Sequence, residues 1–158
     1  MDYIKVEEYV RAATGTEGFS ENTLILFGIN KPVNGRGGNK IAFFWVDKPD
    51  MMLHEVGHAF GLLADEYSFG VRRSLAEIPE IGWPNVDITN DSSLVKWRRY
   101  FGIPGYEDIG MFEGGYYSDT SVWRPTESSV MRDTESDPSA TSLGFNAVCR
   151  EVLFCESY

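Results

Sequence analysis

The stretch LHEVGHAFG at residues 53–61 decides how the rest of the chain is interpreted, because it contains the pattern His-Glu-x-x-His. Two histidines four residues apart on a helix lie on the same side of it. The imidazoles of His54 and His58 can therefore share one tetrahedral zinc ion. Glu55 lies about 100° round the helix from His54, near the metal but free to take a proton from water. The pattern predicts a zinc hydrolase whose metal ligands include His54 and His58 and whose general base is Glu55.

The residues around this motif predict a helix with one apolar face and one metal-binding face. We expect the helix to run from Pro49 to Gly61, with Asp47 as its N-cap. Gly61 falls on the same face as the two histidines, where a larger side chain would crowd the metal. The face expected to pack on the core carries Met52, Val56, Ala59, Phe60 and Leu63.

The third ligand has to be a residue other than histidine, because the chain has only two histidines. A carboxylate, a tyrosine or a cysteine could serve, unless another chain supplies the ligand. We choose Asp65, with Glu66 and Tyr67 as the neighbouring alternatives. A continued helix would place Asp65 about 10 Å along the axis from His58. The chain must therefore leave the helix near Gly61, whose glycine permits a positive φ.

Composition and charge limit the class of protein. The 158 residues suit one domain spanning residues 1–158. The formal net charge of −10 makes nucleic acid a poor partner, and we expect a monomer that acts on a peptide or protein substrate. No apolar run approaches the roughly 20 residues of a membrane span, so we expect no transmembrane segment. No signal peptide is visible either.

The two cysteines do not predict a disulfide framework. Cys149 and Cys155 lie six positions apart in a predicted helix, about 9 Å by helical rise, which exceeds disulfide reach. We expect both to be buried free thiols.

The remaining elements follow from periodicity and turn signals. We expect a buried strand at residues 22–29 and a second strand at 41–46 that forms the upper edge of the cleft. Residues 34–39 read as a flexible turn, 68–91 as loop, and 105–136 as turn-rich sequence with weak strand signals. Helices are expected at residues 2–13, at 92–101 with Asp91 as a cap, and at 141–154.

Residues 54–67, HEVGHAFGLLADEY, resemble the IgA peptidase family of metallopeptidases, whose motif is His-Glu-x-x-His-x-x-Gly followed by Asp-Glu-Tyr. The likeness extends over roughly residues 22–155. Further similar segments are residues 84–86, 96–97, 110–114, 124–125, 130–132 and 148–151.

The resemblance implies an α+β (α/β) metzincin-like fold. Such a fold has a small twisted mixed sheet packed on the active-site helix, a loop-rich lower half and a C-terminal helix. Met131 matches the methionine of the turn beneath the zinc, and Ala64 stands where typical metzincins carry a third histidine, so the ligand moves to Asp65. Ser129 and Asn146 stand where family members often carry cysteines. The family domain usually begins earlier, so the chain would be a trimmed or minimal version.

The resemblance also implies a zinc-dependent endopeptidase, secreted or at the cell surface. Tyr67, Tyr116, Tyr117 and Arg132 are candidates for stabilising the oxyanion, and Tyr67 is the one we name as catalytic. Two alternatives stay open at this point. One is a zinc hydrolase of a non-protein amide, and the other is a zinc-containing module that binds peptides without turnover.

Overall fold

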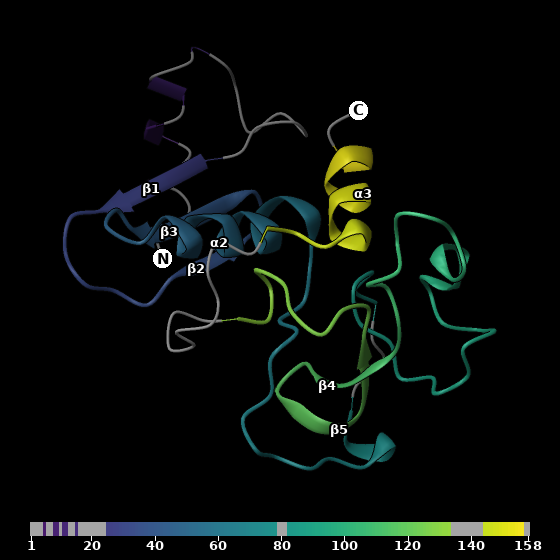
Figure 1. The fold of residues 1–158 in the computed structure, drawn as a ribbon. Coiled ribbons are helices and arrows are strands. Elements are labelled where there is room, and N and C mark those ends of the chain that lie inside the picture. The colour runs from purple at the N-terminus through teal and green to yellow at the C-terminus, as the bar shows by residue number, and fades with distance from the viewer. Residues whose placement is uncertain are drawn as a thin grey trace.

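A computed structural model describes residues 25–78, 82–133 and 144–156, together with residues 5, 8, 9, 11, 12 and 15. The described residues form a mixed α+β architecture of small sheets and two longer helices (Figure 1). Most of the helix predicted at 2–13, the start of the strand predicted at 22–29 and the start of the helix predicted at 141 lie outside the described residues.

The upper half of the molecule is built on a three-stranded mixed sheet. Strand β3 (Ile41–Trp45) lies in the centre, parallel to β1 (Ile25–Ile29) and antiparallel to β2 (Arg36–Gly38). Phe27 and Phe43 are register partners, and their rings stack at 4.8 Å between centroids. A small mixed sheet is therefore present, in agreement with the expected α+β class.

Two details of the sheet differ from the prediction. The strand β1 is not buried but lies at an edge, with alternate side chains exposed and Leu26 45% exposed. The cleft-side edge strand is β2, which falls inside the stretch taken for a flexible turn, and β3 is flanked on both sides. Three residues with two glycines carry too little side-chain pattern to be recognised as a strand.

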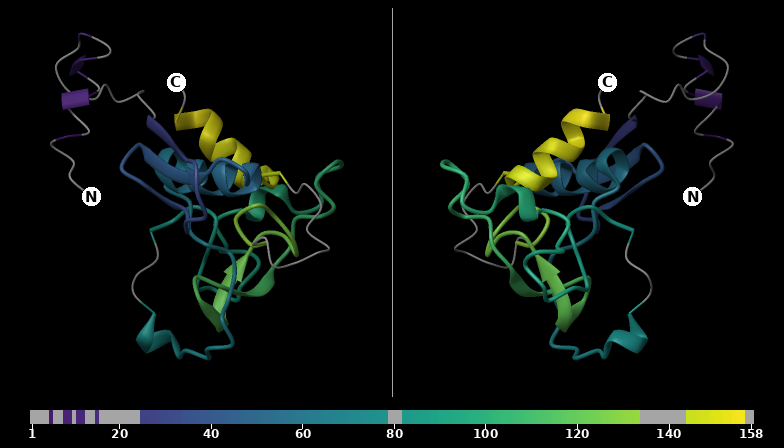
Figure 2. Two further views of the ribbon diagram at one scale, coloured as in Figure 1. Left: turned by 90° about the vertical axis from the view of Figure 1, so that its left-hand side faces the viewer. Right: turned by 90° about the vertical axis from the view of Figure 1, so that its right-hand side faces the viewer.

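Helix α2 (Pro49–Gly61) has the predicted bounds and packs against β3 and β2. Its N-cap is Lys48 rather than Asp47, and no side chain caps it. Helix α3 (Ala147–Glu156) packs across α2, as Figure 2 shows from two sides. Gly61 faces this second helix and not the side of His54 and His58, contrary to expectation, because an added Cβ would lie 2.8 Å from Leu153 Cδ2.

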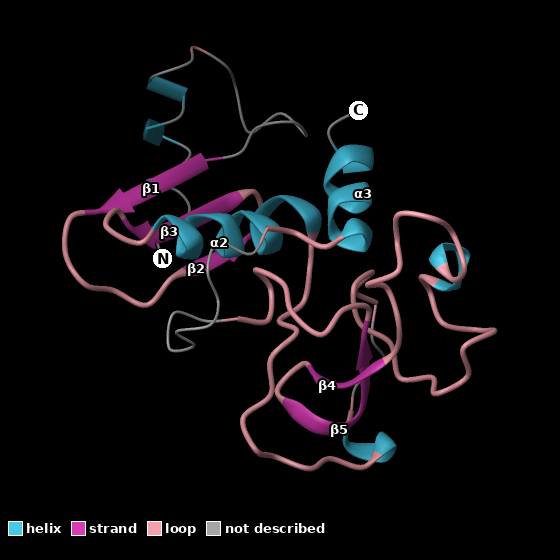
Figure 3. Cartoon of the chain, viewed as in Figure 1, coloured by secondary structure: helices cyan, strands magenta, loops and turns pink. Residues whose placement is uncertain are grey.

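The lower half consists mainly of loops (Figure 3) around the hairpin of β4 (Phe112–Gly115) and β5 (Ser118–Arg124). The loop predicted at 68–91 is confirmed apart from the short 3₁₀ helix η1 (Leu75–Glu77); residues 79–81 lie outside the described part.

The helix predicted at 92–101 is wrong. That segment forms turns and a short 3₁₀ helix, η2 (Arg98–Tyr100). Asp87 Oδ2 accepts the Lys96 N–H at 3.0 Å, a backbone donor that a regular helix would need. Asp91 still caps the first turn, because its Oδ1 accepts the Ser93 N–H at 2.8 Å.

Helix α3 begins at Ala147, later than predicted, because residues 144–146 are not helical. Both cysteines on it are free, but only Cys149 is buried; Cys155 is exposed, contrary to expectation. Within the described part of the chain, no helix has the length and apolar character to cross a membrane.

Three clusters of buried apolar residues hold the two halves together. The first consists of Ala64, Ile78, Val86 and Val122; the second of Val95, Trp97, Ile109, Ala147 and Val148; the third of Leu63, Val130, Met131 and Cys149. Residues that follow α2 directly belong to the first and third clusters, so the segment leading to Asp65 is packed on both sides.

Candidate metal centre

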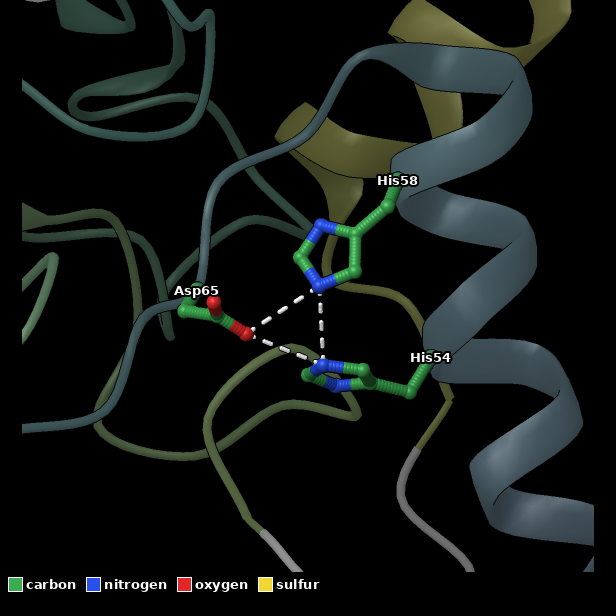
Figure 4. Close-up of side chains that lie close together, drawn as sticks. All are labelled: His54, His58 and Asp65. Carbon is green, nitrogen blue, oxygen red and sulfur yellow. Dashed lines mark hydrogen bonds and ion pairs between the residues drawn. The ribbon is translucent and has the colours of Figure 1, made fainter. Parts of the chain in front are cut away.

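The side chains of His54, His58 and Asp65 converge on one point beside α2 (Figure 4). The Nε2 atoms of the two histidines are 3.0 Å apart. Asp65 Oδ1 lies 3.0 Å from His54 Nε2 and 3.1 Å from His58 Nε2. The three ligand atoms chosen from the sequence therefore form a nearly equilateral triangle.

This triangle fits a small cation. A tetrahedral zinc ion with bonds of about 2.0–2.1 Å separates its ligand atoms by about 3.3–3.4 Å, close to the observed spacing. His54 Nδ1 lies 2.9 Å from Val130 O, and His58 Nδ1 lies 2.7 Å from Leu63 O. A carbonyl can only accept, so both Nδ1 atoms carry hydrogen and a neutral ring presents a lone pair at Nε2. Two such lone pairs facing a carboxylate repel one another unless a cation or an added proton lies between them.

The ionisation of these groups agrees with a site that attracts positive charge. Burial opposes the charged form of His58, but its hydrogen bond to Asp65 and the charge of Asp65 outweigh burial and raise the His58 pKa. Burial likewise opposes the Asp65 carboxylate, yet hydrogen bonds from the imidazoles of His54 and His58, which donate through Nε2 when protonated, hold its pKa well below the usual range. Asp65 therefore stays ionised, as a metal ligand must.

A tight reversal of the chain after α2 places Asp65 beside His54 and His58. The reversal begins at the predicted place, but the positive φ belongs to Leu62, at 49°, and not to Gly61. The Leu63 N–H then donates to Gly57 O at 3.1 Å. A leucine in the left-handed region is uncommon, which is why the sequence pointed to the glycine instead.

Glu55 lies beside the triangle, directly under strand β2. Only 6% of its surface is exposed. A Cβ added to Gly35 would lie 2.1 Å from Glu55 Oε1, and one added to Gly37 would lie 2.1 Å from Glu55 O. The two glycines thus let the strand approach the helix at this residue. Burial raises the pKa of Glu55, and the neighbouring His54 and His58 offset the increase only in part.

Met131 packs against helix α2 at Gly57 and is not among the described residues that line the cleft. It is fully buried, and its Sδ occupies the space next to Gly57, where an added Cβ would be 2.5 Å away. The adjacent Val130 supplies the carbonyl that orients His54, and Met131 O accepts the Glu66 N–H at 2.8 Å. The turn at Met131 therefore supports both the helix and the segment that carries Asp65.

The four oxyanion candidates have different surroundings. Tyr67 lines the cleft, with its ring 6.2 Å from that of His54 and nearly parallel to it; burial raises its pKa to about 12. Tyr116 also lines the cleft and packs on Trp83 at 4.6 Å. Tyr117 donates a hydrogen bond to Asp65 Oδ2. Arg132 is paired with Asp133 at 2.7 Å and is not among the described residues that line the cleft.

The cleft over the triangle has a volume of about 470 Å³. One wall is the glycine-rich backbone of β2 and its flanks, the floor carries the triangle and Glu55, and the opposite wall is aromatic. The aromatic residues that line it are Tyr67, Trp83, Tyr116 and Tyr117.

Glu66, an alternative third ligand, points away from the cleft into the interior. It is fully buried, Ser129 Oγ donates to its Oε2 at 2.6 Å, and Asn146 Nδ2 donates to its Oε1 at 3.1 Å. Ser129 and Asn146 are the two residues that stand where the resemblance places cysteines, and both converge on this carboxyl group. Sequence reasoning did not identify the Glu66 network, since no spacing rule links these three residues.

Comparison with known proteins supplies no relative from which a role can be carried over. No family model matches the chain, and no curated protein matches it either. The likeness to the IgA peptidase family therefore stays a prediction, and the function is argued from the geometry of the site.

Proposed function

We propose that this protein is a zinc-dependent endopeptidase with a metzincin-like catalytic domain, similar to the IgA peptidase family. One observation carries the proposal: three ligand atoms of His54, His58 and Asp65 meet at 3.0–3.1 Å, with the carboxyl group of Glu55 beside them in an open cleft. Three protein ligands that leave a position open are typical of catalytic zinc, whereas structural zinc sites have four.

Zinc bound there supplies Lewis-acid chemistry, polarising a carbonyl and lowering the pKa of water toward about 7. Glu55 holds the proton that a water molecule loses as it attacks the scissile carbonyl, and then passes this proton to the leaving amine. The raised pKa of Glu55 suits a group that must both accept and release a proton near neutral pH. Such a positioned base contributes about 10²- to 10⁴-fold to a rate.

The shape of the cleft favours an extended peptide as substrate. Strand β2 is an edge strand of the described sheet, and an extended chain can pair with the backbone of such a strand. Three of the five residues that line that wall, Gly35, Gly37 and Gly38, carry no side chain, and the other two are Arg36 and Asn39. The aromatic wall opposite offers contact area to the substrate side chains.

The test is metal analysis together with a cleavage assay. The purified full chain should hold one zinc per molecule and cut unfolded protein into fragments that mass spectrometry can assign. Glu55→Ala should keep the zinc and lose at least 99% of the cleavage, in line with the general-base contribution above. A zinc-loaded wild type that binds peptides without cutting them would favour the binding module, and cleavage of non-protein amides alone would favour the other hydrolase.

A further inference from the structure

The turn that joins β4 and β5 has a strained backbone. Gly115 and Ser118 are register partners, so Tyr116 and Tyr117 form a two-residue hairpin loop. Their φ angles are 45° and 65°. A turn with positive φ at both central positions normally takes asparagine and glycine, because a Cβ lies too close to the following carbonyl oxygen there; glycine lacks a Cβ, and asparagine offsets the cost by local hydrogen bonding. Two consecutive tyrosines in this conformation need an explanation other than turn preference.

Backbone hydrogen bonds join the Tyr116–Tyr117 turn to the segment that contains Asp65. The Tyr116 N–H donates to Asp65 O at 2.9 Å, and the Tyr117 N–H donates to Tyr67 O at 3.0 Å. The Tyr117 ring also packs on Tyr67 at 5.4 Å and on Phe69 at 5.7 Å between centroids. The surroundings therefore fix the position of the Tyr117 hydroxyl and hold the strained backbone in place.

The two oxygens of the Asp65 carboxylate have different partners. Its Oδ1 faces His54 and His58 at 3.0 and 3.1 Å, whereas its Oδ2 accepts the hydrogen bond from the Tyr117 hydroxyl. Oδ2 is thereby turned away from the point where the two imidazoles meet. A carboxylate without this hydrogen bond can rotate and offer both oxygens to a cation.

We propose that Tyr117 is a positioning residue that restricts Asp65 to binding metal through Oδ1 alone. One-oxygen binding keeps a coordination position open for water and substrate, which a second oxygen of Asp65 would occupy. Residues that orient a metal ligand in this way typically change metal affinity when they are removed. This role rests on the proposed zinc site, and it explains why the strained tyrosine turn lies against Asp65.

The experiment compares the full chain with two single variants after the metal has been stripped by a chelator. Tyr117→Phe removes the hydroxyl and keeps the ring packing. Tyr116→Phe is the matched control from the same turn, since the Tyr116 hydroxyl has no hydrogen-bond partner among the described residues. Zinc affinity is measured by competition with a coloured chelator, and the absorption spectrum of the cobalt-substituted protein reports the coordination number.

Tyr117→Phe should bind zinc about 10- to 100-fold more weakly and change the cobalt spectrum, whereas Tyr116→Phe should match the wild type in both. Adding Tyr117→Phe to Asp65→Ala should cause no further loss of affinity, because Tyr117 acts through Asp65. A wild type that binds no zinc overturns the proposed function and this role together. A zinc-binding wild type with a Tyr117→Phe variant of equal affinity and spectrum overturns the role alone, as does an equal loss on the Asp65→Ala background.

Discussion

The side-chain amide of Asn85 pairs with both backbone groups of Ala64. The Ala64 N–H donates to Asn85 Oδ1 at 2.8 Å, and Asn85 Nδ2 donates to Ala64 O at 2.9 Å. The same Nδ2 donates to Glu66 Oε1 at 2.9 Å. A single buried amide thus fixes the residues on either side of Asp65, so the position of the third candidate ligand depends on a loop residue about twenty positions further along the chain.

Asn85→Ala should destabilise the protein and weaken metal binding. Asn85 is fully buried, and its loss leaves the Ala64 N–H and C=O without these partners. Buried backbone groups left unpaired cost about 1–3 kcal/mol each, so for these two groups we expect a loss of about 2–6 kcal/mol in the free energy of unfolding. Urea denaturation of the metal-free protein measures the loss. The exposed Asn90 is the control, and an Asn90→Ala variant that loses as much stability would argue against a specific effect at Asn85.

The helix and the common face of its two histidines were predictable because they depend on local sequence. The bounds of α2 and the common side of His54 and His58 follow from helical periodicity, which acts within a few residues. The histidine count and the need for a chain reversal limited the third ligand to a non-histidine residue after the helix, and the family resemblance favoured Asp65 over Glu66 and Tyr67. The strand at residues 41–46 followed in the same way from a short run of apolar and aromatic residues.

What the sequence did not predict depends on contacts between distant residues. Strand β2 forms because Gly35 and Gly37 allow a backbone to approach Glu55, and the two glycines by themselves indicate only a turn. The Tyr117 hydrogen bond to Asp65 joins residues 52 positions apart. The helix expected at 92–101 does not form, because the Lys96 N–H donates to Asp87 Oδ2 and not to a helical carbonyl. Such pairings have no signature in a single sequence.

Gly35→Ala should impair catalysis while the metal stays bound. The added Cβ would lie 2.1 Å from Glu55 Oε1, so the carboxyl group has to move from its place beside the triangle. The three atoms nearest to this Cβ all belong to the Glu55 side chain, so the clash falls first on the base. We expect kcat to fall by at least about 10-fold, because a small displacement of a catalytic base is costly. Zinc content and kcat are measured on the same preparation.

Gly144→Ala is the matched control for Gly35→Ala, because an added Cβ at Gly144 meets nothing within 4 Å. This variant should keep the wild-type kcat. A Gly35→Ala enzyme that is as active as the wild type would show that Glu55 tolerates displacement and would weaken its assignment as base.

Removal of the metal should lower the unfolding temperature, and zinc should restore it. A ligand that binds only the folded state stabilises it by about 2.7 kcal/mol at 100 times its Kd. Asp65→Ala should reduce this zinc-dependent gain strongly, since it leaves only His54 and His58 as ligands. Thermal unfolding with and without excess zinc gives the measurement. If zinc raised the unfolding temperature of Asp65→Ala as much as that of the wild type, the third ligand would be Tyr67 or another residue and not Asp65.

Glu66→Gln should make the metal-free protein more stable relative to the wild type as the pH rises. Burial raises the pKa of Glu66 from 4.5, although hydrogen bonds from Ser129 and Asn85 oppose the shift. The folded state therefore binds the Glu66 proton more tightly than the unfolded state, and this contribution to stability is present at low pH and lost as the pH rises through the folded-state pKa. Glutamine has no proton to lose and can still accept from the Asn85 amide through Oε1 while its Nε2 donates to Ser129 Oγ.

The difference between the unfolding free energies of the Glu66→Gln variant and the wild type should therefore increase above pH 4.5, by at most about 1.4 kcal/mol per pH unit. Urea denaturation in chelator, from pH 5 to pH 8, measures it. Glu107 offers a flat comparison, because the backbone N–H groups of Gly105 and Glu107 hold its pKa below the usual value of 4.5. Its stabilising contribution is lost only as the pH falls below 4.5, so the Glu107→Gln difference should stay nearly constant from pH 5 to pH 8. A Glu66→Gln difference that stays constant with pH would mean that the carboxyl group is ionised in the folded protein throughout this range, as it is in the unfolded chain, and the raised pKa would then be wrong.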